Sequence, residues 1–203
     1  MQVAFTYDEA TLIALPGPAA PPAQTDAWAR AAAARLADRH ADGAVDVDAL
    51  IDVLAHAQAR AAADPSTNLL VFEPVTRAWA PARFTLVERE LDAAEQRRFL
   101  QPAAILPPQR RLCATEGLGL GCSVTVLDEQ GRGRVAWLFV VPGLTFVAAL
   151  DPLAAPAVLP AAASVESTLA TIRIDDRRRA ASAAFDARAF VYPEPTEDLA
   201  WRA

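Results

Sequence analysis

The 203-residue chain contains no lysine, and it has only two cysteines and two histidines. Without lysine it cannot form a lysine Schiff base, use a Ser-Lys dyad or bind phosphate through a P-loop lysine. Two cysteines do not make a disulfide framework, and the spacing of Cys113 and Cys122 matches no common zinc knuckle. These absences exclude several large classes of enzyme and metal-binding module.

The two cysteines have one alternative to remaining free. If residues 117 and 118 form a two-residue hairpin turn, Cys113 and Cys122 become directly opposed and can cross-link under oxidation. Otherwise they are expected to be buried free thiols, which is the ordinary state of isolated cysteines in a protein core.

The charge is acidic, with a formal net charge of -6 and an isoelectric point near 4.9. Nucleic-acid binding needs clustered positive charge to displace counterions from phosphates, so no nucleic-acid partner is expected. The first residues, MQVAFTYDEA, lack a basic segment and carry Asp8 and Glu9 where a signal peptide is apolar. The sequence therefore predicts a cytoplasmic protein.

The longest apolar run, VAWLFVVPGLTFVAAL at 135–150, has Pro142-Gly143 near its centre. This dipeptide favours a tight type II turn, so we expect two buried strands and no membrane insertion. Other strand-like segments precede the run, which places it in an antiparallel sheet that needs cover on both faces. Strands are predicted at 2–7, 11–15, 68–73, 82–90, 110–116, 118–127, 134–141 and 144–150.

Helical patterns occur on both sides of these strands. Helices are predicted at 28–40, 46–63, 91–100 and 165–174, the first capped by Thr25 or Asp26 and the last by Ser164. We predict an α+β fold in which an antiparallel meander (110–150) is covered by helices on both faces, as a three-layer α/β/α sandwich. Residues 1–174 form a single domain with an αα-hairpin at 25–63, and 175–203 form a C-terminal tail that is partly helical, near 177–188, or disordered.

The glycine-rich stretch GLGLGCS at 117–123 has neither the G-x-G-x-x-G spacing nor a Walker lysine. We interpret its glycines as making room for a packed neighbour. Ser123 lacks the second glycine of a nucleophile elbow, and both histidines lie upstream of it, whereas that fold needs one downstream. No nucleotide site or serine nucleophile is predicted here.

Asp52 and His56 share one helix face at a spacing of four residues, but two ligands do not make a metal site. His40 and Asp42 lie at the other end of the hairpin. The basic run 177–179 follows Asp175 and Asp176, which indicates local charge compensation.

Trp79, Tyr192 and Trp201 lie beside prolines or in the tail, and they are candidate anchors for a partner protein or for packing within the domain. We predict no catalytic, cofactor-binding or metal residues and no cofactor.

The element order resembles that of the PsbP/Mog1-like group of α/β/α sandwiches. The similarity spans residues 5–174 and rests on the early segment IALPGP, the last strand LTFVAALDP and the helix VESTLATIRI. The αα-hairpin at 25–63 departs from the smallest members. The resemblance implies an accessory or binding role, and actinobacterial members of the group resemble partners of specialised secretion loci.

Two functional hypotheses follow. The first is a non-enzymatic interaction protein, an adaptor, chaperone or assembly factor that binds a protein partner through a sheet edge or a helical face. The alternative is a small-molecule-binding or hydrolytic domain with a pocket between the sheet and a helix layer. The oligomeric state is not predicted.

Overall fold

The computed structural model describes residues 1–16, 21–41, 43–61, 66–175 and 178–192. They form a mixed α+β structure around a seven-stranded antiparallel sheet. The strands in spatial order are β2 (Leu12–Ala14), β3 (Thr67–Glu73), β4 (Ala78–Val87), β8 (Leu144–Ala154), β7 (Arg132–Val141), β6 (Gly119–Leu127) and β5 (Gln109–Thr115). A small second sheet pairs β1 (Val3–Ala4) with β9 (Arg173–Ile174). The predicted meander is confirmed as β5 to β8.

The long apolar run forms the hairpin of β7 and β8, as its Pro-Gly turn predicts. Val141 pairs with Leu144, and Gly143 between them has a φ of 78°, in the left-handed region that favours glycine. Within the described residues, no helix is long and apolar enough to cross a bilayer. The apolar character of the run comes instead from burial of both faces of these two strands.

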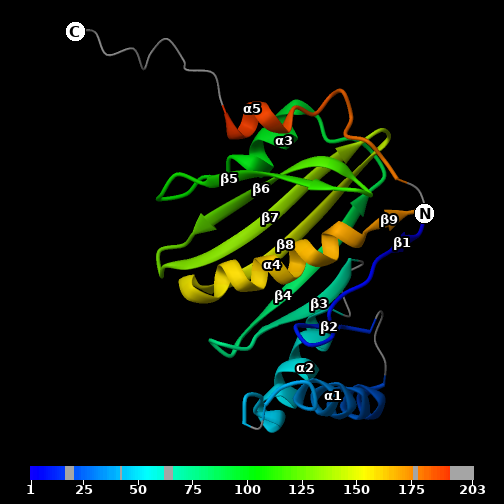
Figure 1. Cartoon of the computed structure of the whole chain (residues 1–203), viewed down its shortest axis with the longest axis vertical. Helices are drawn as coiled ribbons and strands as arrows, with labels where there is room; N and C mark the ends of the chain where they lie inside the picture. Colours follow the sequence, from blue (N-terminus) through cyan, green and yellow to red (C-terminus); the bar gives the residue numbers. More distant parts are fainter. Residues whose placement is uncertain (17–20, 42, 62–65, 176–177, 193–203) are drawn as a thin grey trace.

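Helices lie on both faces of the sheet (Figure 1). One face carries α4 (Ala155–Thr171), which packs over the large core that includes Trp137 and Phe139. The opposite face is covered at two separate places. The hairpin of α1 (Pro22–Ala37) and α2 (Val47–Ala61) covers β2 and β3, while α3 (Ala93–Leu100) and α5 (Ala187–Val191) cover β5, β6 and β7. Strand alternation separates these cores, because Leu69 and Leu70 point to opposite faces.

Two predicted helix starts were wrong, because both helices begin in proline-containing segments that had been interpreted as loops. The first helix begins at Pro22 and not at residue 28, and the last begins at Ala155 and not at residue 165. A proline in the first turn costs little, because its missing N–H has no partner there anyway. Pro160 does lie inside α4, where burial of Ala157, Val158, Ala161 and Ala162 offsets the lost hydrogen bond.

The predicted start of β4 at residue 82 was also wrong, because the strand begins at Ala78 and contains Pro81. Pro81 pairs with Leu70 on β3, whereas pairing with β8 begins only at Ala82. The proline therefore lies at a position of β4 with no strand partner on its other side among the described residues, the kind of position at which a sheet accepts proline. This four-residue extension brings Trp79 and Pro81 into the sheet.

The segment after β9 packs on the sheet in its described part, residues 178–192. The Ser182 amide donates a hydrogen bond to the Val140 carbonyl at 2.8 Å, and Phe185 is buried in the core under α3 and α5. The helix here is α5, Ala187–Val191, and not the predicted 177–188. The remainder of the predicted tail, 193–203, lies outside the described residues.

The end of α4 and the C-terminal segment each explain one of the glycines in the stretch at 117–123. A Cβ at Gly117 would meet the Ile172 carbonyl oxygen at 1.7 Å, and a Cβ at Gly119 would meet the Ala181 amide nitrogen at 2.6 Å. A Cβ at Gly121 would meet the Phe139 ring at 2.4 Å. The interpretation of these glycines as positions of close packing is confirmed.

We therefore expect Gly119→Ala to destabilise the protein more than Gly131→Ala. Both glycines have positive φ, 75° and 71°, but a Cβ at Gly131 meets nothing within 4 Å. The shared backbone strain costs about 1–2 kcal/mol, and overpacking adds about 1–3 kcal/mol at Gly119 alone. Urea unfolding of both variants measures the difference, and equal losses would show that residues 180–181 do not pack on this turn.

The hairpin of β3 and β4 is closed by a buried carboxylate. Glu73, 3% exposed, accepts hydrogen bonds from the Val75 amide at 3.1 Å, the Thr76 amide at 2.6 Å and the Thr76 hydroxyl. Burial by itself raises the pKa of Glu73, but the hydrogen bonds from Thr76 and Val75 outweigh it, so the pKa lies below its ordinary value. The charged form is thus favoured in the folded state.

This lowered pKa makes the hairpin acid-sensitive. Glu73 contributes stability above the unfolded-state pKa of about 4.3, and this contribution is lost as pH falls through the lower folded-state pKa. We expect Glu73→Gln to be less stable than the parent at pH 6 and closer to it at pH 3, as measured by thermal unfolding across this range. Glu129→Gln, at an exposed turn position, is the control, and a Glu73→Gln penalty that does not change with pH would contradict the assignment.

Candidate functional site

A pocket lies between α2 and the sheet face formed by β3 and β4, and we call it the α2 pocket. Its volume is about 540 Å³, within the range of about 300–1,000 Å³ typical of small-molecule sites. The apolar lining consists of Leu15, Val53, Ala57, Ala61, Leu70, Trp79 and Pro81. The polar lining consists of Asp52, His56, Arg60, Asn68, Arg83 and Asp151.

The helical spacing of residues on α2 and their alternation on β4 bring the lining residues together. On α2 the lining residues recur every four positions, at 52–53, 56–57 and 60–61, so they share one helix face. On β4 the lining residues alternate, at Trp79, Pro81 and Arg83, so they share one sheet face. The partners on β3 are Leu70 opposite Pro81 and Asn68 opposite Arg83.

A stack of rings holds the wall of the pocket in place. The Trp79 indole stacks on Phe72 with the ring centroids 4.1 Å apart and the planes 23° apart. The Phe72 ring also meets the edge of the His40 ring at 5.1 Å. His40 is itself anchored, because its Nε2 lies 2.7 Å from the Ala10 carbonyl oxygen. The orientation of Trp79 therefore depends on residues outside the pocket.

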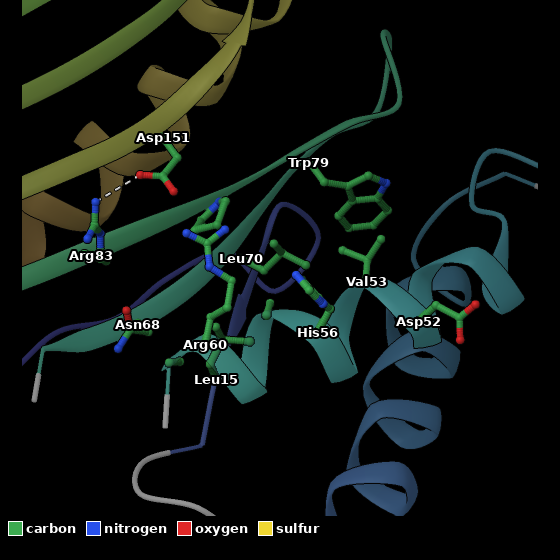
Figure 2. Close-up of a pocket in the computed structure, with 13 residues that line it drawn as sticks. Leu15, Asp52, Val53, His56, Arg60, Asn68, Leu70, Trp79, Arg83 and Asp151 are labelled. Carbon is green, nitrogen blue, oxygen red and sulfur yellow. Dashed lines mark hydrogen bonds and ion pairs between the residues drawn. The ribbon is translucent and has the colours of Figure 1, made fainter. Parts of the chain in front are cut away.

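The opposite end of the pocket is charged. Arg83 forms an ion pair with Asp151 at 3.1 Å, which ties β4 to β8. Figure 2 shows Arg60 extending from the last turn of α2 toward the strands, on the side of the pocket where Arg83 and Asp151 lie. Trp79 and Val53 lie on the other side of this view, as does Asp52, whose carboxylate points away from the pocket, so the indole and the two guanidinium groups occupy different ends.

Asp52 and His56, which share one face of α2, point in different directions. Figure 2 shows the His56 ring pointing toward the strands, whereas the Asp52 carboxylate points away from the pocket. Nowhere in the described ranges do three or more His, Cys, Asp or Glu side chains gather in a group that could hold a metal ion. His40 is used in packing, and Asp42 lies outside the described residues.

The remaining sequence candidates lie elsewhere. Ser123 is 2% exposed in β6, where its hydroxyl faces the Arg111 carbonyl oxygen at 3.5 Å. Arg179 lies 3.7 Å from Asp175, as local charge compensation predicts, whereas Arg178 pairs with Glu116, which is far away in the sequence. Tyr192 is exposed, whereas Arg177 and Trp201 lie outside the described residues.

The two cysteines are not placed to cross-link. Cys113 pairs with Gly121, while Cys122 pairs with Leu112, so their side chains enter cores on opposite faces of the sheet. Both thiols are free. Burial raises the pKa of Cys113 to about 12 and that of Cys122 to about 11, which keeps them protonated and unreactive at neutral pH.

Sequence reasoning missed most of the α2 pocket. Trp79 and Arg83 lie an even number of residues apart, so a strand that included both would place them on one face. Trp79 was left out of the predicted strand because residues 74–81 were interpreted as a connection. Arg60 continues the four-residue series of Asp52 and His56, and this signal could have extended that pair into a helix face. Asp151 comes from a strand end far away in the sequence, and no local pattern relates it to Arg83.

Comparison with known proteins adds no relative, since no family model, curated protein or solved structure matches the chain. The chemistry of the site therefore comes from its own residues. It offers an apolar wall for a ligand body, hydrogen-bonding groups along one side, and guanidinium groups at one end. Such a set is suited to binding and orienting an organic molecule.

Proposed function

We propose that this protein is a non-enzymatic binding protein whose α2 pocket holds a small organic molecule. The single observation that carries the proposal is the pocket itself, about 540 Å³ of space with an apolar wall and a few convergent polar groups. We also propose that the fold is the predicted three-layer α/β/α sandwich. The ligand would then lie between the α1–α2 layer and the sheet.

A neutral fluorescent probe tests this function without assuming a charged ligand. We expect N-phenyl-1-naphthylamine to become fluorescent on binding, and Ala57→Phe to abolish the signal by filling the pocket from α2. Ala59→Phe is the matched control, because residue 59 is exposed on the same helix and does not line the pocket. If Ala57→Phe folds normally and binds the probe like the parent protein, the α2 pocket is not the site.

A second candidate function is binding of a protein partner, the role that the PsbP/Mog1-like resemblance also implies. It is supported by the position of β5, the last strand at one edge of the large sheet, for which β6 is the only partner among the described strands. An open edge can accept an added strand from another chain. Arg110 and Arg111 on this strand are charged residues of the kind that prevent indiscriminate pairing of edges.

Hydrogen exchange distinguishes this second function from the first. A partner that adds a strand is expected to slow exchange of the amides in β5 by at least about tenfold, since it would hydrogen-bond the outer edge. The measurement compares the isolated protein with a complex purified from the native host. Protection confined to α1 and α2, with β5 unchanged, would exclude strand addition as the binding mode.

A further inference from the structure

We infer that the ligand of the α2 pocket is a monoanion with an elongated apolar body and a carboxylate head group. This inference rests on the proposed small-molecule function and specifies its chemistry. The inference comes from the difference between the two ends of the pocket. Both α2 and β4 run from its apolar end to its charged end, so Val53 and Trp79 lie at one end and Arg60 and Arg83 at the other.

The apolar end lies toward the N-terminal part of the lining on both elements, where the Asp52 carboxylate points away from the pocket. Val53 on α2 and Trp79 on β4 stand at this end (Figure 2), and the stacking of Trp79 on Phe72 keeps the indole as a fixed wall. Leu70 and Pro81, which are cross-strand partners, continue the apolar surface toward the middle of the pocket. A hydrocarbon or aromatic body gains about 0.8 kcal/mol for each CH₂ that it buries there.

The charged end lies toward the C-terminal part of the lining on both elements, at Arg60 and Arg83. Arg83 already has a carboxylate partner in Asp151 at 3.1 Å. Arg60 has no ion-pair partner within the described part of the chain, although its side chain extends toward the strands. One positive charge is therefore left for the ligand at this end.

The charge balance selects the head group. A single remaining guanidinium matches one negative charge, and its planar fork suits the two oxygens of a carboxylate. A dianionic phosphate would bring its second charge close to Asp151 without a second free cation. A ligand amine would face Arg60 and Arg83 and is disfavoured by repulsion.

Three probes with one body and different head groups test the inference. They are 8-phenyloctanoate, 8-phenyloctanol and 8-phenyloctylamine, with dissociation constants measured by isothermal titration at low ionic strength. We expect the acid to bind about 10-fold tighter than the alcohol, because it gains a charge-assisted hydrogen bond. The amine is expected to bind more weakly than the alcohol.

Arg60→Met removes the charge and keeps an apolar stem of similar reach. It is expected to weaken binding of the acid about 10-fold and to leave binding of the alcohol unchanged. Arg30→Met, at an exposed position on α1 outside the pocket, is the matched control and should change neither. Since Arg60 is exposed, the variant should fold normally, which circular dichroism checks.

The outcomes separate the two proposals. If the three probes bind equally and Ala57→Phe weakens all of them, the pocket is a ligand site and the monoanion inference is wrong. The same inference fails if the amine binds most tightly or if Arg60→Met does not affect the acid. If neither these probes nor N-phenyl-1-naphthylamine binds, both the ligand class and the proposed function fail.

Discussion

The structure depends on one constraint: the central strands of the large sheet are apolar on both faces. Trp137 and Phe139 point into one core, while Leu138 and Val140 point into the other. A strand of this kind cannot leave either face in water, so each face needs a cover of helices. Among the described elements, α4 covers one face, but the opposite face is covered in two parts by elements that are far apart in the sequence. The division of that cover leaves room at the middle of the sheet, and the α2 pocket lies where the α1–α2 hairpin meets β4.

Much of the fold could be predicted from the sequence, because the signals were local. The Pro142-Gly143 turn and the strands beside it follow from residues that touch each other along the chain, and so does α3, whose capping box of Asp92 and Glu95 is present. Three of the errors occurred at prolines. Pro22, Pro81 and Pro160 were interpreted as interruptions, whereas the first helix turn, a sheet position without a second neighbour and a buried helix can each accept one.

The candidate site was far less predictable, because its residues come from separate elements. Asp52 and His56 were recognised as one helix face, but what they face depends on how the hairpin packs on β3 and β4. The partnership of Arg83 with Asp151 exists only because β4 pairs with β8 across 68 positions of sequence. His40 was a candidate ligand in the sequence, and its actual contact with Phe72 required the three-dimensional arrangement.

The composition of α2 explains why the pocket is open. In the first half of this helix the core-facing positions are Leu50 and Leu54, both fully buried, and they fill the space against the sheet. In the second half the corresponding positions are Ala57 and Ala61, whose small side chains leave space in front of β4. A leucine at either alanine would be the simpler choice for stability alone, because filling such space with apolar volume favours the folded state. Two alanines beside His56 and Arg60 instead keep an apolar space next to polar groups, which is the arrangement expected of a ligand site.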